Sequence, residues 1–187
     1  MTTPKTTGFN SNTHKHLVLD AGAIYLNYGE ENETLLGATQ GGGTFNATPE
    51  WRNIAVDGVK GRAMGMSLIN AWEVSLSASM LEITPENLKL ALGVADITTG
   101  TDGETVIKGR NNVLPTDYVK NVTWVGKLSG AETPVIIKVL NALSETGLSL
   151  TTADNTEGLV PLEFFGHIDP LSATEPPFEI IYPNVTI

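Results

Sequence analysis

AWEVSLSASMLEITPENLKLALG, residues 71–93, runs from a strand pattern directly into a helix pattern. Over residues 71–83 apolar and polar side chains alternate, and alternate residues of a strand point to opposite faces of a sheet. The apolar set, which we expect to be buried, is Trp72, Val74, Leu76, Ala78 and Met80, and the polar set is Glu73, Ser75, Ser77 and Ser79. The first half of the stretch therefore predicts a half-buried strand.

The second half of the stretch carries the signals of a short helix. Thr84 is a typical N-cap residue, Pro85 suits the first helical turn, and Glu86 adds a favourable negative charge there. Gly93 stands where a helix C-cap is expected. These signals predict one helix over residues 84–92, packed on the sheet.

Period-two patterns recur along most of the remaining chain. They cover residues 16–28, 44–56, 118–130, 134–143, 158–168 and 178–182. Pro49 marks an edge or a bulge in its strand, because proline cannot donate to a sheet ladder. Residues 95–109 are rich in turn residues, and Asp102-Gly103 predicts a hairpin tip. The chain is therefore predicted to be mainly β, a β-sandwich or barrel with one short flanking α-helix.

Length and composition favour one soluble domain. The 187 residues show no internal repeat and no linker, so we expect a single β domain over residues 16–187. Residues 1–15 are polar, do not resemble a secretory signal, and are expected to form a flexible arm. No apolar run approaches the ~18 residues of a membrane span, so no membrane partner is expected.

The charge and the absence of cysteine exclude several classes of function. With no cysteine, the chain can form no disulfide and has no thiolate nucleophile. The formal net charge is −10. Proteins that grip DNA need a basic face, because neutralising phosphates supplies most of their affinity. We therefore expect this chain to repel DNA.

The sequence contains no motif of a catalytic or cofactor site. IAVDGVKGRAMG, residues 54–65, lacks the spacing of a P-loop, and Asp57 has no further carboxylates at the spacing of a calcium loop. His14 and His16 belong to the polar arm, and we interpret His167 as a rim histidine. We expect no enzyme activity, no metal and no cofactor.

Three Gly-rich motifs follow one another in a fixed order. DAGAIYLNYG begins at residue 20, LLGATQGGGTF at residue 35 and EWRNIAVDGVKGRAMG at residue 50. This ordered set resembles the major tail tube proteins of long-tailed, siphovirus-type bacteriophages, especially those of Gram-positive hosts. The resemblance covers residues 20–65 and continues through the predicted strand 71–83 and helix 84–92.

The resemblance implies a β-sandwich subunit related in fold to the tube protein of type VI secretion. Six copies would form a ring, and stacked rings would form a tube in the virion tail that conducts DNA during ejection. The implied partners are the chain itself, the tape measure protein and the tail-end proteins, with assembly in the host cytoplasm. Such a subunit is structural and has no catalytic residues.

The resemblance also assigns the long inter-strand loop, residues 54–70 here, to contacts between subunits. The interface residues expected in this loop are Asp57, Gly58, Gly61, Arg62, Gly65 and Met66. Residues 62–69, RAMGMSLI, are more apolar than a solvent loop, which favours burial against another subunit. The three glycines are expected to supply turns with positive φ or to allow close backbone approach.

The polar set of the strand 71–83 is the candidate lumen-facing surface. Glu73, Ser75, Ser77 and Ser79 would present small polar groups to an aqueous channel. Six copies at −10 each would carry a formal charge of about −60. DNA has about one charge per ~1.7 Å and the screening length is ~8 Å at physiological salt, so passing DNA would be repelled rather than bound.

Two other functions remain open from the sequence. A carbohydrate-binding β-sandwich module would use exposed aromatic side chains, for which Trp51, Trp124 and Tyr118 are candidates. An acidic β-barrel hydrolase would need a pair of carboxylates at a set separation, and no motif identifies such a pair.

Overall fold

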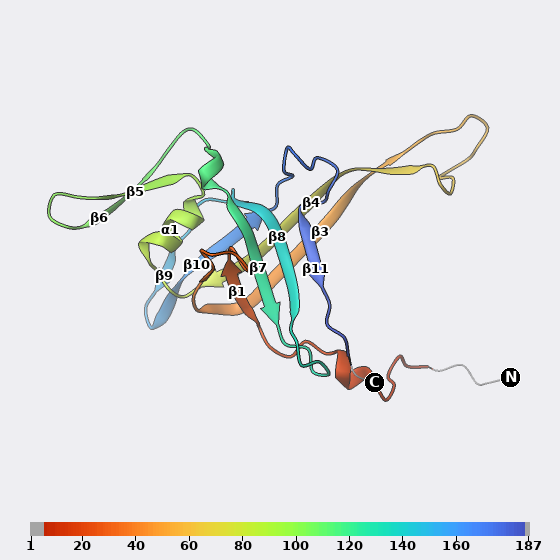
Figure 1. The fold of residues 1–187 in the computed structure, drawn as a ribbon, viewed down its shortest axis with the longest axis horizontal. Helices are drawn as coiled ribbons and strands as arrows, with labels where there is room; N and C mark the ends of the chain where they lie inside the picture. Colours follow the sequence, from red (N-terminus) through yellow and green to blue (C-terminus); the bar gives the residue numbers. More distant parts are fainter. Residues whose placement is uncertain (1–5, 186–187) are drawn as a thin grey trace.

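The computed structural model describes residues 6–185, of which strands make up most of the regular structure, with 46% of residues in strands and 8% in helices. The strands are β1 (Ala23–Leu26), β2 (Thr34–Leu35), β3 (Thr39–Asn53), β4 (Ser67–Met80), β5 (Ala95–Thr99), β6 (Thr105–Gly109), β7 (Val119–Gly126), β8 (Val135–Ser144), β9 (Thr151–Ala153), β10 (Thr156–Phe165) and β11 (Phe178–Ile181). The α-helix is α1 (Pro85–Leu92), and two short 3₁₀ helices are η1 (Thr13–His16) and η2 (Pro115–Asp117). The expected class, mainly β with one short helix, is confirmed (Figure 1).

One large antiparallel sheet carries the fold, in the order β2-β1-β7-β8-β10-β4-β3. β8 changes partner along its length: residues 136–139 pair with β11, whereas residues 143–144 pair with β10. The sheet therefore bends at β8, and the long β3–β4 pair crosses behind β7 and β8 (Figure 1). This arrangement is sandwich-like, with the core between the two halves of the sheet.

The core is built from alternate residues of the central strands. The buried apolar side chains include Ile24, Val74, Leu76, Met80, Val122, Val139, Leu162 and Phe164. Fully burying one such side chain contributes about 1.5–3 kcal/mol relative to leaving it exposed. Phe178 of β11 closes one side of this core, with its ring 5.2 Å from that of Trp72 and 5.9 Å from that of Phe45.

The strand and helix predicted from residues 71–93 are confirmed. Of the predicted apolar set on β4, the four residues after Trp72 are buried, and Trp72 is half-buried. Thr84 Oγ1 accepts a hydrogen bond from the backbone N–H of Asn87 at 3.2 Å, as an N-cap should. Gly93 ends the helix with φ +72°, and a Cβ there would lie 2.0 Å from the carbonyl oxygen of Ser144. Only glycine fits this position.

The first predicted strand is shorter than its pattern suggested. Of residues 16–28, only Ala23–Leu26 form β1, and Val18 makes an isolated bridge with Leu128. Gly22 has φ +74°, and a Cβ there would lie 2.3 Å from the indole nitrogen of Trp124, so the backbone turns sharply before β1. The prediction of a continuous strand was wrong because a tertiary contact overrides the alternating pattern.

The loop predicted over residues 54–70 is also shorter than expected. Residues 67–70 belong to β4, since Asn53 pairs with Ser67 and the ladder continues back toward the body. The preceding strand spans residues 39–53 rather than 44–56. Pro49 lies on β3, the last strand of the sheet, one residue before a bulge at Glu50 and Trp51, so its predicted position at an edge or bulge is confirmed.

The N-terminal residues expected to form a flexible arm lie partly outside the described residues, which begin at residue 6. The described part includes η1, which contacts the body: the Ser129 hydroxyl donates a hydrogen bond to the carbonyl of His14. The imidazole Nδ1 of His16 lies 3.0 Å from the hydroxyl of Tyr182. Residues 95–109 form the β5–β6 hairpin with Gly103 at φ +86° near its tip, as predicted.

Candidate assembly surfaces

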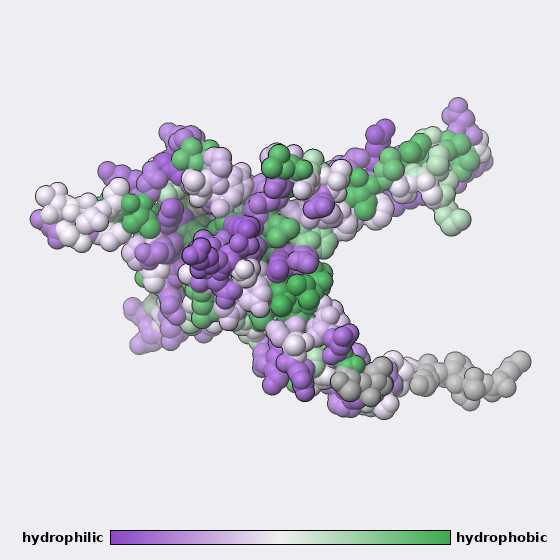
Figure 2. All heavy atoms as spheres, viewed as in Figure 1, coloured by the Kyte–Doolittle hydropathy of each residue, from purple (hydrophilic) through white to green (hydrophobic). Residues whose placement is uncertain are grey.

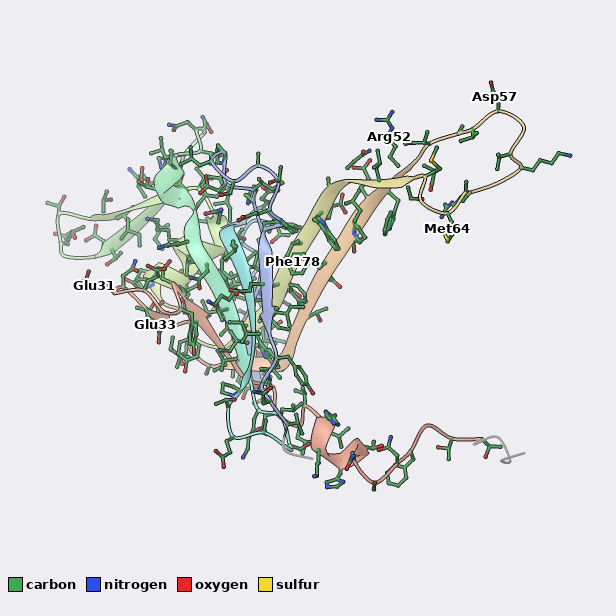
Figure 3. All side chains as sticks on the ribbon, turned by 45° about the vertical axis from the view of Figure 1, so that its right-hand side comes forward. Glu31, Glu33, Arg52, Asp57, Met64 and Phe178 are labelled. Carbon is green, nitrogen blue, oxygen red and sulfur yellow. The ribbon has the colours of Figure 1, made fainter. Side chains whose placement is uncertain are left out.

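The outer ends of β3 and β4 leave the body as a two-stranded ribbon, here called the arm (residues 51–69). Trp51 pairs with Ile69 and Asn53 with Ser67, and the backbone N–H of Ile54 donates to the carbonyl of Met66 at 2.8 Å. Beyond that bond the chain forms a loop, residues 54–66, here called the tip. The ribbon extends away from every other element (Figures 1 and 3). The long inter-strand loop inferred from the sequence is therefore held out by a hairpin.

Glycines shape the tip. Gly58, Gly61 and Gly65 have φ of +82°, +110° and +83°, values that L side chains rarely adopt. A Cβ at any of the three would have no heavy atom within 4 Å. The expected positive φ is confirmed, and the glycines serve the backbone conformation rather than close packing.

Large apolar side chains of the arm are exposed to solvent. They are Trp51 (56%), Ile54 (41%), Val56 (40%), Val59 (50%), Met64 (103%), Leu68 (49%) and Ile69 (43%). Apolar atoms run along the ribbon in the space-filling view (Figure 2). Exposed apolar side chains are common singly, but a contiguous row of them is typical of an interaction surface.

Met64 is the interface candidate that the sequence analysis missed. It is fully exposed, whereas Met66, the methionine expected at the interface, is half-buried. Both belong to the apolar stretch 62–69, whose burial against another subunit stays a prediction. Gly65, with φ +83°, stands between the two methionines, and composition alone does not specify which of them is exposed.

The charged residues of the tip are exposed and have no ion-pair partner in the described part of the chain. Among residues 6–185, no ion pair or side-chain hydrogen bond engages Asp57, Lys60 or Arg62, and all three are exposed. Asp57 and Met64 lie on different parts of the loop and point away from the body (Figure 3). Their expected role between subunits stays a prediction.

A second surface is the outer face of the β3–β4–β10 sheet. On β4 it carries the predicted polar set, and the cross-strand partners on β3 are polar as well. Ser79 pairs with Gln40, Ser77 with Thr44, Ser75 with Asn46 and Glu73 with Thr48. On the other side Ser77 pairs with Glu163 of β10. A shallow groove of about 420 Å³ lies along this face, bordered by Gly41, Gly42 and Glu163.

Ser75 differs from the rest of the predicted polar set. It lies on the polar face but is only 7% exposed, whereas Glu73 is exposed and Ser77 and Ser79 are half-buried. Its partner on β10 is Phe165, and Gly166 continues the pairing by donating to the carbonyl of Val74 at 2.9 Å. The aromatic neighbour and the extra segment cover Ser75, so within one chain it is not open to solvent.

His167 is held by its surroundings. Its Nε2 lies 3.0 Å from Oε1 of Glu145 and its Nδ1 lies 3.1 Å from the carbonyl oxygen of Asn141. The ring packs edge-on against Tyr118 at 5.0 Å. Both ring nitrogens therefore have a partner within the chain. The neighbouring Asp169 instead accepts from the backbone N–H of Leu171.

Within residues 6–185, no three histidine, aspartate or glutamate side chains gather closely enough to hold a metal ion. In the same part of the chain, no helix has the length and apolar character needed to cross a membrane. No protein-family model matches the chain, and no curated protein matches it. Any functional proposal therefore rests on the residues and geometry described above.

Proposed function

We propose that the chain is a self-assembling structural subunit of a tail tube of the bacteriophage type, forming rings that stack around a DNA-conducting lumen. The ordered motifs over residues 20–65 support this proposal through their resemblance to tail tube proteins. Its partners would be further copies of itself, with the tape measure and tail-end proteins at the ends of the tube in the virion. No step of this function requires catalysis.

The arm is the observation that carries the proposal. A two-stranded ribbon is at best marginally stable alone, and this one exposes a row of large apolar side chains. Burying apolar surface is worth roughly 25 cal/mol per Å². Contact with a second copy would therefore stabilise the ribbon and remove the exposed apolar surface from water in one step.

The outer face of the β3–β4–β10 sheet suits the wall of a conduit. Residues 39–50, 71–80 and 156–165 contain no lysine or arginine, and Glu50, Glu73 and Glu163 add negative charge. Small hydroxyl and carboxylate groups offer DNA neither cations to bind nor aromatic surface on which bases stack. DNA could pass such a wall without being retained.

Negative-stain electron microscopy of the full chain over a range of concentrations tests the proposal. Rings or tubes are expected, with a central channel. Particles that stay monomeric at all concentrations, with and without other tail components, would contradict it.

A carbohydrate-binding module is the second candidate, because Trp51 is 56% exposed. The other two aromatic candidates are less available: Trp124 is half-buried and donates from Nε1 to the carbonyl of Ala21 at 2.7 Å, and Tyr118 packs on His167. A glycan array discriminates the two functions. Glycan binding that Trp51→Ala abolishes would favour the module, and a blank array with assembled tubes would favour the structural subunit.

A further inference from the structure

The arm is the basic part of an acidic chain. Residues 51–66 hold three cations, Arg52, Lys60 and Arg62, and one acid, Asp57. The formal charge of these residues is +2. Because the whole chain has a formal charge of −10, the remaining residues together carry −12. The arm and the body of one copy are thus complementary to each other in charge, yet they do not touch at the tip. This favours contact between the tip of one copy and the body of another.

A groove of about 540 Å³ lies on the other side of the molecule, between the β1–β2 turn, α1 and the start of β7. Its apolar lining includes Leu26, Leu90, Leu143 and Phe164. Pockets of 300–1,000 Å³ commonly accept a ligand the size of several side chains. The groove can therefore receive apolar side chains from a partner.

The rim of this groove is acidic. Glu31 and Glu33 flank Asn32, which lines the groove, and Glu86 of α1 lines it directly. Two lysines also line it: Nζ of Lys120 is paired with Glu30 at 2.7 Å, and Lys89 lies three residues after Glu86 on α1. The excess of negative charge therefore comes from Glu31 and Glu33 beside the lining. Beside the acids, Leu35 is 57% exposed. The rim and floor together match a partner that is both basic and apolar.

Building on the proposed tube, we propose that the tip of one copy docks into the groove between α1 and the β1–β2 turn of a second copy. The exposed Met64 and Val59 enter the apolar floor, while Lys60 and Arg62 face Glu31, Glu33 and Glu86 on the rim. The oppositely charged partners would speed encounter and fix the orientation of the arm, and the apolar contacts would hold it.

The positions of tip and groove decide the symmetry of this contact. Glu31 and Glu33 lie on the side of the molecule opposite Asp57 and Met64 (Figure 3). The two surfaces are different and far apart, so the contact is heterologous, and each copy offers one tip and one groove. A heterologous contact builds closed rings or open filaments rather than an isolated two-fold dimer.

Reciprocal charge reversal tests the docking. Lys60→Glu with Arg62→Glu makes the tip acidic, and Glu31→Lys with Glu33→Lys makes the rim basic; all four side chains are exposed and outside the core. Each double variant alone is expected to weaken self-association at least about tenfold, because like charges then face each other. An equimolar mixture of the two variants is expected to restore it, since each tip again meets a groove of opposite charge. Sedimentation velocity measures the self-association of each double variant and of the mixture.

The controls place equal changes elsewhere. Glu132→Lys with Glu175→Lys reverses two exposed acids that do not line the groove, and Lys108→Glu with Lys127→Glu reverses two exposed cations outside the arm. Both controls should assemble as the unmodified chain does, and circular dichroism checks that every variant is folded.

The outcomes separate the docking from the tube. If the unmodified chain forms rings or tubes and both reversed variants assemble equally well, or if the mixture shows no rescue, the docking site is wrong while the tube proposal stands. If the unmodified chain does not assemble under any condition, both proposals fail. Loss in each variant with rescue in the mixture supports the docking.

Discussion

Two glycines of this chain that share a positive φ have different surroundings. Gly93 and Gly58 both have positive φ, +72° and +82°. At Gly93 a Cβ would collide with the backbone of Ser144, whereas at Gly58 it would meet open space. Conformation alone therefore costs both sites a similar amount on substitution, and packing costs only the first.

Gly93→Ala is expected to lower the free energy of unfolding by more than about 3 kcal/mol. A left-handed conformation costs a non-glycine residue roughly 1–2 kcal/mol, and the clash with a backbone oxygen adds to it. Gly58→Ala, the matched control, should cost only about 1 kcal/mol because its side chain has room. Chemical denaturation measures both, and equal losses would contradict the distinction between packing and conformation.

At the scale of elements, the chain separates a body that contains the core from an arm that does not contribute to it. No arm residue belongs to the buried core of residues 6–185, which lies in the body where β4 meets β8 and β10. Substitutions in the tip should therefore cost stability no more than the local backbone strain they introduce, about 1 kcal/mol at Gly58, while altering assembly. The β3–β4 ladder connects the two parts, so a change in the tip can reach the core only through that ribbon.

Gly58→Val and Asp57→Ala are expected to impair ring or tube formation more than folding. Valine disfavours positive φ and would change the course of the tip, and alanine removes the carboxylate that is exposed there. Sedimentation of each variant, beside its thermal unfolding, separates the two effects. Normal tubes from both variants would show that the tip is dispensable for assembly.

At the scale of the whole molecule, the sequence predicts what local signals determine. The strand expected over 71–83, the helix expected over 84–92 and the tip glycines follow from alternation, capping and turn chemistry. All three are present, although the strand spans Ser67–Met80 and ends three residues earlier than predicted. The short length of β1 could not be predicted from local signals, because the turn at Gly22 depends on Trp124, about a hundred positions away. The burial of Ser75 likewise depends on Phe165 of another strand.

The groove could not be predicted from the sequence for the same reason. Its lining comes from β1, α1, β7, β8 and β10, which only the register of the sheet brings together. The composition of the arm could be predicted from the sequence, but its exposure could not. Its apolar stretch is visible in the sequence. A period-two pattern, however, does not show whether the apolar face of a strand is covered by other elements or left exposed.

The orientation of the whole subunit in a tube can be tested through its polar sheet face. Glu50 and Glu73 are exposed residues of β3 and β4, away from the groove. Replacing both with lysine would shift the net charge of a ring of six by about +24, close to passing DNA if this face lines the lumen. We expect intact tubes by electron microscopy, slower DNA passage, and retention of DNA that weakens as salt increases. Glu132→Lys with Glu175→Lys adds the same charge elsewhere and should not slow passage. Unchanged passage in Glu50→Lys with Glu73→Lys would show that another face of the subunit surrounds the DNA.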